Sequence, residues 1–331
     1  MTTTTTTTRA IIAGCGGYLP ERIVRNDDLA EAFGLETSDA WITERTGIRQ
    51  RHIAAPGETA SAMGTAAARR ALECAGLGPE SVDAVIVATA TPDSSFPATA
   101  AKIQAALGMT RGIAFDVSAA CAGFVYALGI ADGFIRTGQA RSVMVVGTEV
   151  YSRIVDWTER GTSVLFGDGA GAVLLVAGEG QGTSADRGIL STHLHSDGRF
   201  ADILLVDGGP GSTGGTGKLR MAGNQVFRHA VSKLAAVVDE ALDANGLGHS
   251  DVRWLVPHQA NLRIISAMGR KLGLPPERVV VTVDRHANTS AASIPLALAE
   301  AASDGRIERG DLVVMEAIGG GLAWGAALAR F

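Results

Sequence analysis

Long hydrophobic runs are missing from this sequence, as are the other signs of a secreted or membrane-bound chain. No apolar stretch approaches the roughly 20 residues that a membrane helix needs. The N-terminal threonine run lacks a cationic segment leading into an apolar one, so we predict no signal peptide. We interpret residues 1–8 as a disordered tail and expect the protein to be cytoplasmic, without membrane contact.

Cysteine and proline are also scarce, and neither sign of charge is in large excess. The cysteines, Cys15, Cys74 and Cys121, are too few and too scattered for a disulfide framework, and no pair has zinc-ligand spacing. The 10 prolines against 42 glycines favour tight turns over a proline-rich linker. A net charge of -5 gives no general attraction to nucleic acid. His193 and His195 lack an evident third ligand, so we predict no metal site.

What the sequence does contain is an internal repeat. Residues 71–87 and 241–256 both read as an Ala/Leu-rich helix, a Gly-Leu-Gly cap, a polar turn and an apolar strand. In each case a second strand follows (GIAFDV or VVVTVD), then a helix of small residues, another strand and a Gly-rich closing strand. Alternating helices and buried strands predict an α/β fold.

The repeated order predicts two duplicated halves of similar length. We assign residues 9–180 to an N-terminal half and residues 181–331 to a C-terminal half, each with one sheet covered by helices. The Gly-, Ser-, Thr- and Asp-rich segment 179–219 reads as a long surface excursion between the halves that helps to shape a pocket.

Three residues at predicted strand ends are candidates for chemistry. Cys121 and Asn288 follow roughly corresponding strands of the two halves, and His258 follows the strand of residues 254–257. Ligands bind beyond the carboxyl ends of strands in such sheets, so the three converge if the halves pack about a pseudo-twofold axis. A cysteine at a helix N-terminus is favoured as thiolate by the helix dipole and free N–H groups.

Each of these residues also has a purely structural interpretation. His258 is either a hydrogen-bond donor to developing negative charge or a core histidine, and Asn288 is either a second donor or a cap. The glycines 319–321 leave backbone N–H groups free, as an oxyanion hole requires, yet they also suit a tight turn. Arg263 and Arg270 share one helix face that suits an acidic partner or simply solvent.

Longer motifs point to one family. They are SDAWITERTGI, DVSAACAGF, RGTSVLFGDGAGA, MAGNQVF, VPHQANLRII and DRHANTSAASIPLAL, and they belong to a match that runs from about Arg9 to Phe331. In these motifs the chain resembles the β-ketoacyl-acyl-carrier-protein synthase III family. The resemblance implies a thiolase-like fold, in which two duplicated α/β halves form αβαβα layers.

The resemblance also implies a reaction. Cys121 attacks the thioester of a short acyl-CoA, expected to be acetyl-CoA, and holds the acyl group. Malonyl-acyl-carrier protein then loses CO2, while His258 and Asn288 stabilise the enolate that attacks the acyl-cysteine. The N–H groups of Cys121 and Gly320 form the oxyanion hole. No cofactor is required because decarboxylation drives the reaction, which initiates type II fatty acid synthesis.

The family implies three further groups of contacts. The residues expected to bind CoA are Trp41, Arg45, Arg160, Gly223 and Asn261. The residues expected to bind the carrier protein are Arg228, Gln259, Arg263, Arg270 and Lys271. Phe96 is expected to reach across a homodimer into the partner's acyl pocket.

One position departs from the family. Ile318 precedes the triple glycine where the family usually has Phe, and we expect a changed decarboxylation rate or acyl preference. A type III polyketide synthase or a specialised condensing enzyme with another primer stays open. A thiolase would need a second cysteine after Cys121, and a papain-like hydrolase would need a different sequence around it. A catalytically silent scaffold also stays open.

Overall fold

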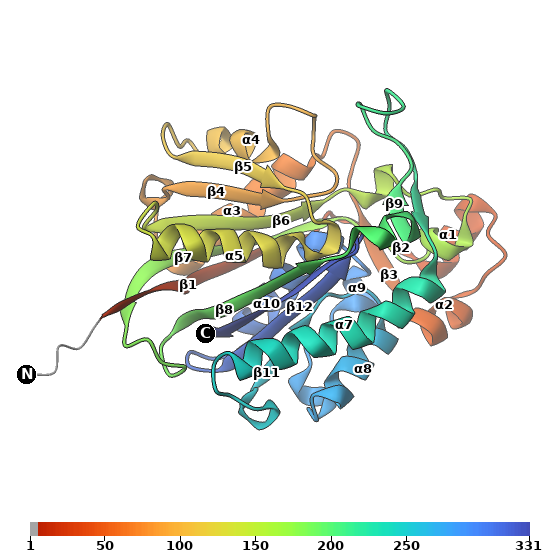
Figure 1. Ribbon diagram of the computed structural model, residues 1–331. Helices are drawn as coiled ribbons and strands as arrows, with labels where there is room; N and C mark the ends of the chain where they lie inside the picture. The colour runs from red at the N-terminus through yellow and green to blue at the C-terminus, as the bar shows by residue number, and fades with distance from the viewer. Residues whose placement is uncertain (1–5) are drawn as a thin grey trace, which may run out of the picture.

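The structure is a computed structural model that describes residues 6–331 (Figure 1). Most of the predicted tail, residues 1–5, lies outside the described residues. The prediction of a tail extending to residue 8 is wrong, because Thr7 and Thr8 already belong to β1 and pair with Gly180 and Glu179.

Two mixed sheets form the molecule. The first contains, from edge to edge, β1 (Thr7–Tyr18), β7 (Gly169–Gly180), β6 (Ser142–Glu149), β4 (Ala84–Ala88) and β5 (Ile113–Val117). The second contains β8 (Gly188–Ser196), β13 (Ala323–Arg330), β12 (Leu312–Gly319) and β11 (Trp254–Pro257). In both sheets the first three strands pair antiparallel and the later ones parallel.

The four strands of the second sheet therefore repeat β1, β7, β6 and β4 of the first in order and direction, which confirms the predicted duplication. From β4 to β6 and from β11 to β12, most equivalent elements start 170 residues apart: β6 starts at Ser142 and β12 at Leu312, and the 3-10 turns η2 (Ala120–Ala122) and η7 (Ser290–Ala292) have the same offset. The predicted division between residues 180 and 181 falls in the link from β7 to β8.

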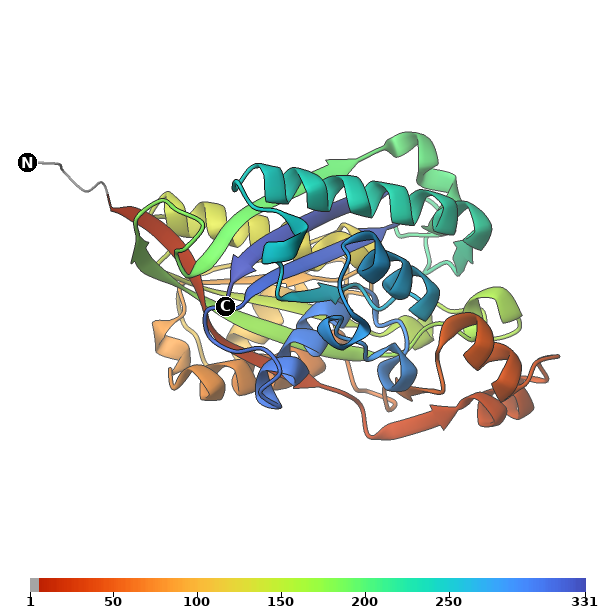
Figure 2. The same cartoon turned by 90° about the horizontal axis from the view of Figure 1, so that it is seen from below.

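Helices complete five layers, as expected for a thiolase-like fold (Figure 1). The outer face of the first sheet carries α3 (Ala60–Ala75) and α4 (Thr99–Ala106), and the middle layer holds α5 (Gly123–Arg136) and α10 (Ser293–Ser303). The outer face of the second sheet carries α7 (Gly223–Asp243) and α8 (Leu262–Lys271), which cross it in Figure 2. None of the helices within residues 6–331 is long and apolar enough to cross a membrane.

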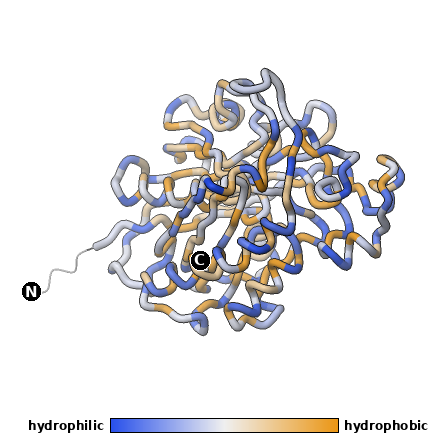
Figure 3. Tube along the Cα trace, turned by 45° about the vertical axis from the view of Figure 1, so that its right-hand side comes forward, coloured by the Kyte–Doolittle hydropathy of each residue, from blue (hydrophilic) through white to orange (hydrophobic). Residues whose placement is uncertain are grey.

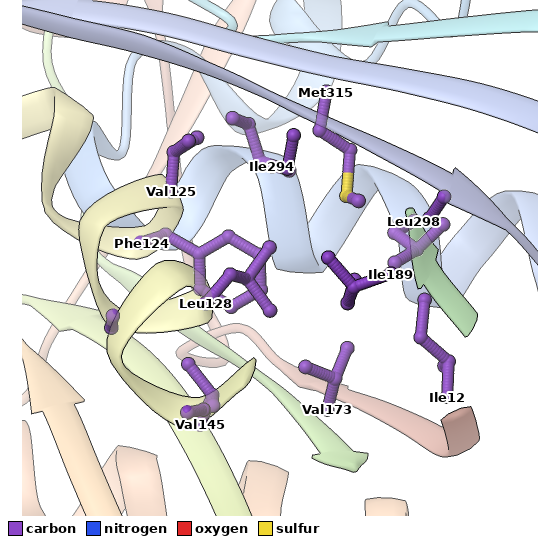
Figure 4. Packing of buried hydrophobic residues seen from close by; sticks show 14 of the residues in the cluster. Ile12, Phe124, Val125, Leu128, Val145, Val173, Ile189, Ile294, Leu298 and Met315 are labelled. Atoms are coloured by element: carbon purple, nitrogen blue, oxygen red, sulfur yellow. The ribbon is translucent and has the colours of Figure 1, made fainter. Parts of the chain in front are cut away.

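The middle layer is the centre of the core. Phe124 and Leu128 of α5 meet Ile294 of α10 between strand residues of both sheets, including Val145 and Met315 (Figure 4). Each large apolar side chain that is fully buried here contributes about 1.5–3 kcal/mol. Outer elements alternate between hydrophilic and hydrophobic segments, because only one face of each is covered (Figure 3).

Glycine ends the long outer helix in both halves, as the repeated Gly-Leu-Gly predicts. Gly76 and Gly246 both have left-handed backbone, with φ of 66° and 63°. The N–H groups of the following Leu77 and Leu247 return to carbonyls of the last helical turn. These caps turn the chain into the next strand of each sheet.

Small elements surround the open end of the sheets. They are β2 (Arg22–Arg25), α1 (Asn26–Phe33), α2 (Asp39–Thr46), β3 (Gln50–Ile53), α6 (Arg160–Ser163), β9 (Leu204–Val206), β10 (Leu219–Met221) and α9 (Val283–His286). The prediction of an irregular excursion over residues 179–219 is wrong in part. This stretch contains the whole of β8, whose pairing with β13 makes it an edge of the second sheet, and β9, which forms a hairpin with β10.

The predicted strand VVVTVD is also not formed. Only Val279 makes an isolated bridge to Leu255, and helix α9 starts at Val283. The buried side chain of Gln259 explains the difference. Its amide donates to the Val280 carbonyl and accepts from the N–H groups of residues 282 and 283, so it takes hydrogen bonds that a strand neighbour would otherwise make.

Candidate active site

A cavity of about 680 Å³ opens at the carboxyl ends of β5 and β11. Its lining includes all three predicted catalytic residues, Cys121, His258 and Asn288, which lie far apart in the sequence. Gly320 and Ile318 line it as well. The convergence expected from the duplicated fold is therefore present at one site.

Cys121 lies in the tight turn η2 between β5 and α5. The residue before it, Ala120, has a left-handed backbone with φ of 45°, which is unfavourable for a residue with a Cβ. Such backbone conformations concentrate at functional sites, where the surrounding structure fixes a side chain in one orientation. The turn places Cys121 at the start of the α5 segment, as the sequence indicates.

The thiolate that we expected is not the resting form of Cys121. Burial raises the pKa of this thiol to about 12, although a hydrogen bond with the Ser290 hydroxyl acts in the opposite direction. The cost of removing a charge from water is thus larger than the stabilisation offered by the helix start. Cys121 is a neutral thiol near neutral pH and must lose its proton when it reacts.

His258 is a buried, neutral histidine at the end of β11. Its backbone N–H donates to the Glu316 carbonyl (2.8 Å), and its Nδ1 lies 2.7 Å from the Ser293 hydroxyl oxygen. Burial lowers the pKa of His258 to about 3. Because the Ser293 oxygen accepts from the backbone N–H of Gln259, its own proton is available to Nδ1. This arrangement favours the tautomer with the proton on Nε2.

Asn288 is oriented by its neighbour in the turn. The Ser290 backbone N–H donates to the Asn288 Oδ1 (2.9 Å), which leaves the Nδ2 group as the donor available to a ligand. The main chain of Asn288 is fixed too, since it exchanges hydrogen bonds with Leu165 and Gly167. His258 and Asn288 are thus two neutral donors at one cavity.

The triple glycine packs closely on the nucleophile turn. A Cβ at Gly319 would lie 2.5 Å from the backbone nitrogen of Cys121, so only glycine fits this place. A Cβ at Gly320 would lie 2.6 Å from the carbonyl oxygen of Leu204. The predicted oxyanion residues, Cys121 and Gly320, line the same cavity.

The residues expected to bind CoA lie at or beside the cavity. Two guanidinium groups stack on the Trp41 ring, with Cζ of Arg45 4.5 Å and Cζ of Arg160 4.6 Å from its centroid. Arg45, Gly223 and Asn261 line the cavity. The Asn261 side chain caps α8 by accepting from the Arg263 N–H and also donates to the Arg45 carbonyl.

The basic residues expected to receive a carrier protein lie on the neighbouring helices α7 and α8. Arg263 and Arg270 border a groove of about 370 Å³ that includes the exposed ring of Phe227. Arg228 is exposed near the start of α7, and Lys271 borders a neighbouring groove with Arg270.

Gln259 does not belong to this surface. The prediction that it contacts a carrier protein is wrong, because its side chain is fully buried and holds the segment before α9 in place. His286 is close to Asn288 in the sequence, but it borders a different cavity, and its Nε2 is 3.6 Å from a carboxylate oxygen of Glu300.

Phe96 is the most exposed large apolar residue within residues 6–331, with 86% of its surface accessible. It lies in the loop between β4 and α4. The neighbouring edge strand β5 is only partly covered, and its first residue, Ile113, is exposed. The first sheet therefore has an uncovered edge at β5, with exposed apolar side chains beside it.

Three polar residues of the site were not recognised in the sequence. They are Ser293, which orients His258, Ser290, which contacts Cys121, and Glu149, a fully buried carboxylate bonded to Ser290. The two serines stand inside the motif DRHANTSAAS, next to Asn288, so their proximity was available in the sequence. Nothing in the sequence around Glu149 signals its position.

The chain is similar to known proteins over nearly its whole length. Residues 115–198 match the family 3-oxoacyl-(acyl-carrier-protein) synthase III, and residues 242–331 match its C-terminal part. A β-ketoacyl-acyl-carrier-protein synthase III of Acidiphilium cryptum (strain JF-5) is 67% identical over 323 residues, 98% of this chain and 99% of the relative.

Solved structures agree with this similarity. The 3-oxoacyl-acyl-carrier-protein synthase III of Aquifex aeolicus VF5 superposes with a TM-score of 0.90 at 46% identity, over 97% of this chain and 100% of that chain. The priming β-ketosynthase of the R1128 polyketide pathway has the same TM-score at 38% identity, over 98% and 96%. Together with the duplicated layers, these matches place the chain in the β-ketoacyl-acyl-carrier-protein synthase III family, whose fold is the thiolase fold.

Proposed function

We propose that this chain condenses a short acyl-CoA with malonyl-acyl-carrier protein. The products are a 3-ketoacyl-carrier protein, CoA and CO2, and the reaction initiates type II fatty acid synthesis. One observation carries the proposal: Cys121 shares a cavity with two neutral donors, His258 and Asn288, each oriented by a neighbouring serine. The names of the similar proteins support it.

In the first step, the sulfur of Cys121 attacks the thioester carbonyl of acyl-CoA. A negative charge develops on the carbonyl oxygen, and we assign its stabilisation to the backbone N–H groups of Cys121 and Gly320. The close approach of Gly319 to the Cys121 nitrogen supports this role, because a residue without a side chain does not push that nitrogen out of place. CoA leaves, and the acyl group stays on the sulfur.

In the second step, malonyl-carrier protein loses CO2. The thioester oxygen of the resulting enolate accepts hydrogen bonds from Nε2 of His258 and Nδ2 of Asn288. Both donors are neutral, and the low pKa of His258 keeps the imidazole uncharged throughout the physiological range. The enolate carbon attacks the acyl-cysteine, and Cys121 leaves as thiolate. Loss of CO2 drives the sequence, so it contains no metal or redox step.

The shape of the cavity beside Cys121 supports a short primer. Tyr151 and Phe166 both line it and stack on each other with ring centroids 4.9 Å apart. Two stacked, buried rings occupy space that a long acyl chain would need. We therefore propose acetyl-CoA as the primer.

We propose that the CoA nucleotide binds at Trp41. A planar base can replace one of the two guanidinium groups that stack on this ring, and the displaced Arg45 or Arg160 can then pair with phosphate. The pantetheine arm would pass Gly223 and Asn261 to reach Cys121.

The same entrance suits an acidic carrier protein. Arg263 stacks over the ring of Phe227, with its Cζ 5.5 Å from the centroid, so an apolar anchor and positive charge lie together beside the cavity. We propose that Arg228, Arg270 and Lys271 extend this surface. Charged contacts of this kind chiefly raise the association rate and fail at high salt.

A homodimer would cover the exposed Phe96 and the edge of β5, and we propose that Phe96 enters the partner's acyl pocket. The three free cysteines are typical of a reducing compartment, which supports a cytoplasmic location.

Intact-mass spectrometry tests the function directly. We expect the wild-type protein to gain the mass of an acetyl group from acetyl-CoA and to lose it on addition of malonyl-carrier protein, with release of a 3-ketoacyl product. Cys121→Ser should form no thioester. A panel of longer and branched acyl-CoAs measures primer choice. Failure of every donor to acylate the wild type would refute the proposal and favour a scaffold.

A further inference from the structure

A buried carboxylate lies behind the nucleophile and takes no part in the reaction described so far. Glu149, the last residue of β6, is fully buried. Its carboxylate accepts from the hydroxyls of Thr91 (2.6 Å) and Ser290 (3.0 Å) and from the backbone N–H of Ala90. Burying a carboxylate away from solvent costs free energy even when it accepts hydrogen bonds in this way, so a function that compensates for the cost is worth seeking.

Ser290 connects this carboxylate to the reacting sulfur. The Ser290 hydroxyl lies 3.0 Å from Oε1 of Glu149 and 3.1 Å from the Tyr151 hydroxyl. The same hydroxyl acts on the Cys121 thiol, because a hydrogen bond with Ser290 lowers the pKa of that thiol against the effect of burial. Ser290 itself is fully buried, with a left-handed backbone at φ of 51°. The Ser290 hydroxyl therefore stands between the Cys121 thiol, whose pKa it lowers, and the carboxylate to which it donates.

We propose that Glu149 acts on Cys121 through Ser290, as the positioning residue that takes up the thiol proton when Cys121 attacks the acyl-CoA. This inference rests on the proposed function. The S–H bond of Cys121 breaks as its proton moves to the Ser290 oxygen, while the original Ser290 proton moves to Oε1 of Glu149. The sulfur electron pair forms the new bond to the thioester carbon, and CoA leaves as thiolate.

The same path resets the site. Cys121 is expelled as thiolate when the enolate attacks, and the proton held on Glu149 returns to it through Ser290. No proton or charge is left over after a full cycle. After the forward transfer the Ser290 hydroxyl points at the sulfur, so it also stabilises the thiolate at the moment of attack.

Charge favours Glu149 over His258 as the acceptor. Transfer to His258 would create a thiolate and an imidazolium in a buried site, whereas transfer to Glu149 only moves a negative charge that is already present. Burial raises the pKa of Glu149 to about 7 and lowers that of His258 to about 3, so the carboxylate is the stronger base of the two.

The competing interpretation is that Glu149 only caps the turn before α10, where it also accepts from the backbone N–H of Ala291. A cap stabilises the fold and does not act on one chemical step. The two interpretations therefore differ in which half-reaction they affect and in its pH profile.

The experiment measures the rate of acetylation of Cys121 by acetyl-CoA between pH 5.5 and 9, by quenched-flow mass spectrometry, for wild type, Glu149→Gln, Ser290→Ala and the double variant. We expect Glu149→Gln to slow acetylation at least about tenfold. Discharge of the pre-formed acetyl enzyme by malonyl-carrier protein should change less than about twofold, because that step expels a thiolate and needs no base.

The pH profile gives a second readout. Wild-type acetylation should fall as the pH drops below about 7, where Glu149 becomes protonated, and this limb should be absent from Glu149→Gln. The titratable groups that face Glu149 are the Cys121 thiol and the Tyr151 phenol, and burial raises the pKa of both. The double variant should be no slower than Ser290→Ala, because both changes interrupt one path.

Asp168→Asn is the matched control. Asp168 is another fully buried carboxylate, held by the Ser152 hydroxyl (2.6 Å) and the Ala54 N–H (2.7 Å). Its variant should lower the melting temperature as Glu149→Gln does, without changing the pH profile of acetylation. Equal loss in both half-reactions, or an unchanged profile in Glu149→Gln, overturns the inference while the proposed function stands. Absence of acetylation in the wild type overturns both.

Discussion

The two halves build the same turn and complete it differently. In each half a left-handed residue, Ala120 or Ser290, precedes a middle-layer helix, and the last residue of a strand from the other half packs on the turn. Gly319 of β12 lies against the Cys121 turn and has no side chain to fill it, so the turn is open to the cavity. Glu149 of β6 occupies the Ser290 turn with its carboxylate.

This difference shows how a duplicated fold yields one active site. The residue equivalent to Cys121 is Ala291, and not Asn288 as the sequence comparison suggested, since equivalent positions differ by 170 residues. Ala291 is fully buried. One turn therefore offers its backbone and sulfur to substrate, and the other, closed by a carboxylate, contributes only supporting groups to the shared cavity.

The largest effect comes from exchanging the two turns. Cys121→Ala should reduce acyl transfer by at least roughly a thousandfold, as loss of a nucleophile does elsewhere. Adding Ala291→Cys should not restore it, because that position has no contact with solvent and its Cβ packs beside Gly123 at the start of α5. Intact-mass analysis with acetyl-CoA measures both. A thioester at position 291 of the double variant would show that the two turns are chemically equivalent.

Removing the donors affects the second half-reaction. His258→Ala and Asn288→Ala should each slow decarboxylation of malonyl-carrier protein by about 10²–10³, the usual cost of a lost donor at a developing oxyanion. Acetylation of Cys121 should change much less. Because the pKa of His258 is about 3, we expect no loss of wild-type decarboxylation from protonation of His258 between pH 5 and 8. Measuring CO2 release separately from acetylation checks the assignment, which equal losses in both steps would contradict.

Gly319→Ala tests the open turn directly. The added Cβ would lie 2.5 Å from the Cys121 nitrogen, so the turn must shift. A displacement of about 1 Å in a reacting group costs around a hundredfold in rate. Both half-reactions should fall, because the oxyanion hole and the sulfur move together. Gly325→Ala, in the middle of β13, is a control for glycine loss in the same sheet: its Cβ would meet the His193 carbonyl and not the site. Comparable activity loss in both variants would contradict the interpretation.

How much of this could be read from the sequence depends on the kind of interaction. The repeated helix caps and most of the strands follow from periodicity, which is a local signal. The convergence of Cys121, His258 and Asn288 follows from their places at strand ends together with the packing of two duplicated halves. The path from Glu149 to Cys121 crosses from one half to the other through Ser290, and no spacing encodes it. Likewise Gln259 looked like an exposed polar residue because its partners at residues 280–283 are brought to it only by tertiary packing.

The two halves also differ behind the turns, at Asp116 and His286, which are 170 residues apart. The Asp116 carboxylate accepts from the N–H groups of Thr99 and Ala100, whereas Nδ1 of the buried His286 has no partner among residues 6–331.

Burial lowers the pKa of His286 to about 3, from 6.5 when unfolded. Its neutral form therefore costs no stability above pH 6.5, and stability is lost as the pH falls from 6.5 towards 3. In His286→Gln the melting temperature should fall less between pH 7 and pH 5 than in wild type, by about 2–4 °C per kcal/mol relieved. An unchanged difference would show that His286 is not buried neutral.

The smallest expected effect is at Ile318, where the halves meet over the cavity. Ile318 is buried two residues before Gly320 and lines the cavity. Isoleucine and phenylalanine are both apolar, so either excludes water from the malonyl carboxylate, but a ring has a different shape against the neighbouring His258. We expect Ile318→Phe to keep condensation and to change the decarboxylation rate or the preference among acyl-CoAs by a few-fold, about 1 kcal/mol or less.

A steady-state assay with acetyl-, propionyl- and isobutyryl-CoA distinguishes the two effects, since a change in decarboxylation alters all primers equally while a change in the acyl pocket alters their ratio. Identical rates and ratios in both proteins would mean that the residue before the triple glycine serves only to fill space.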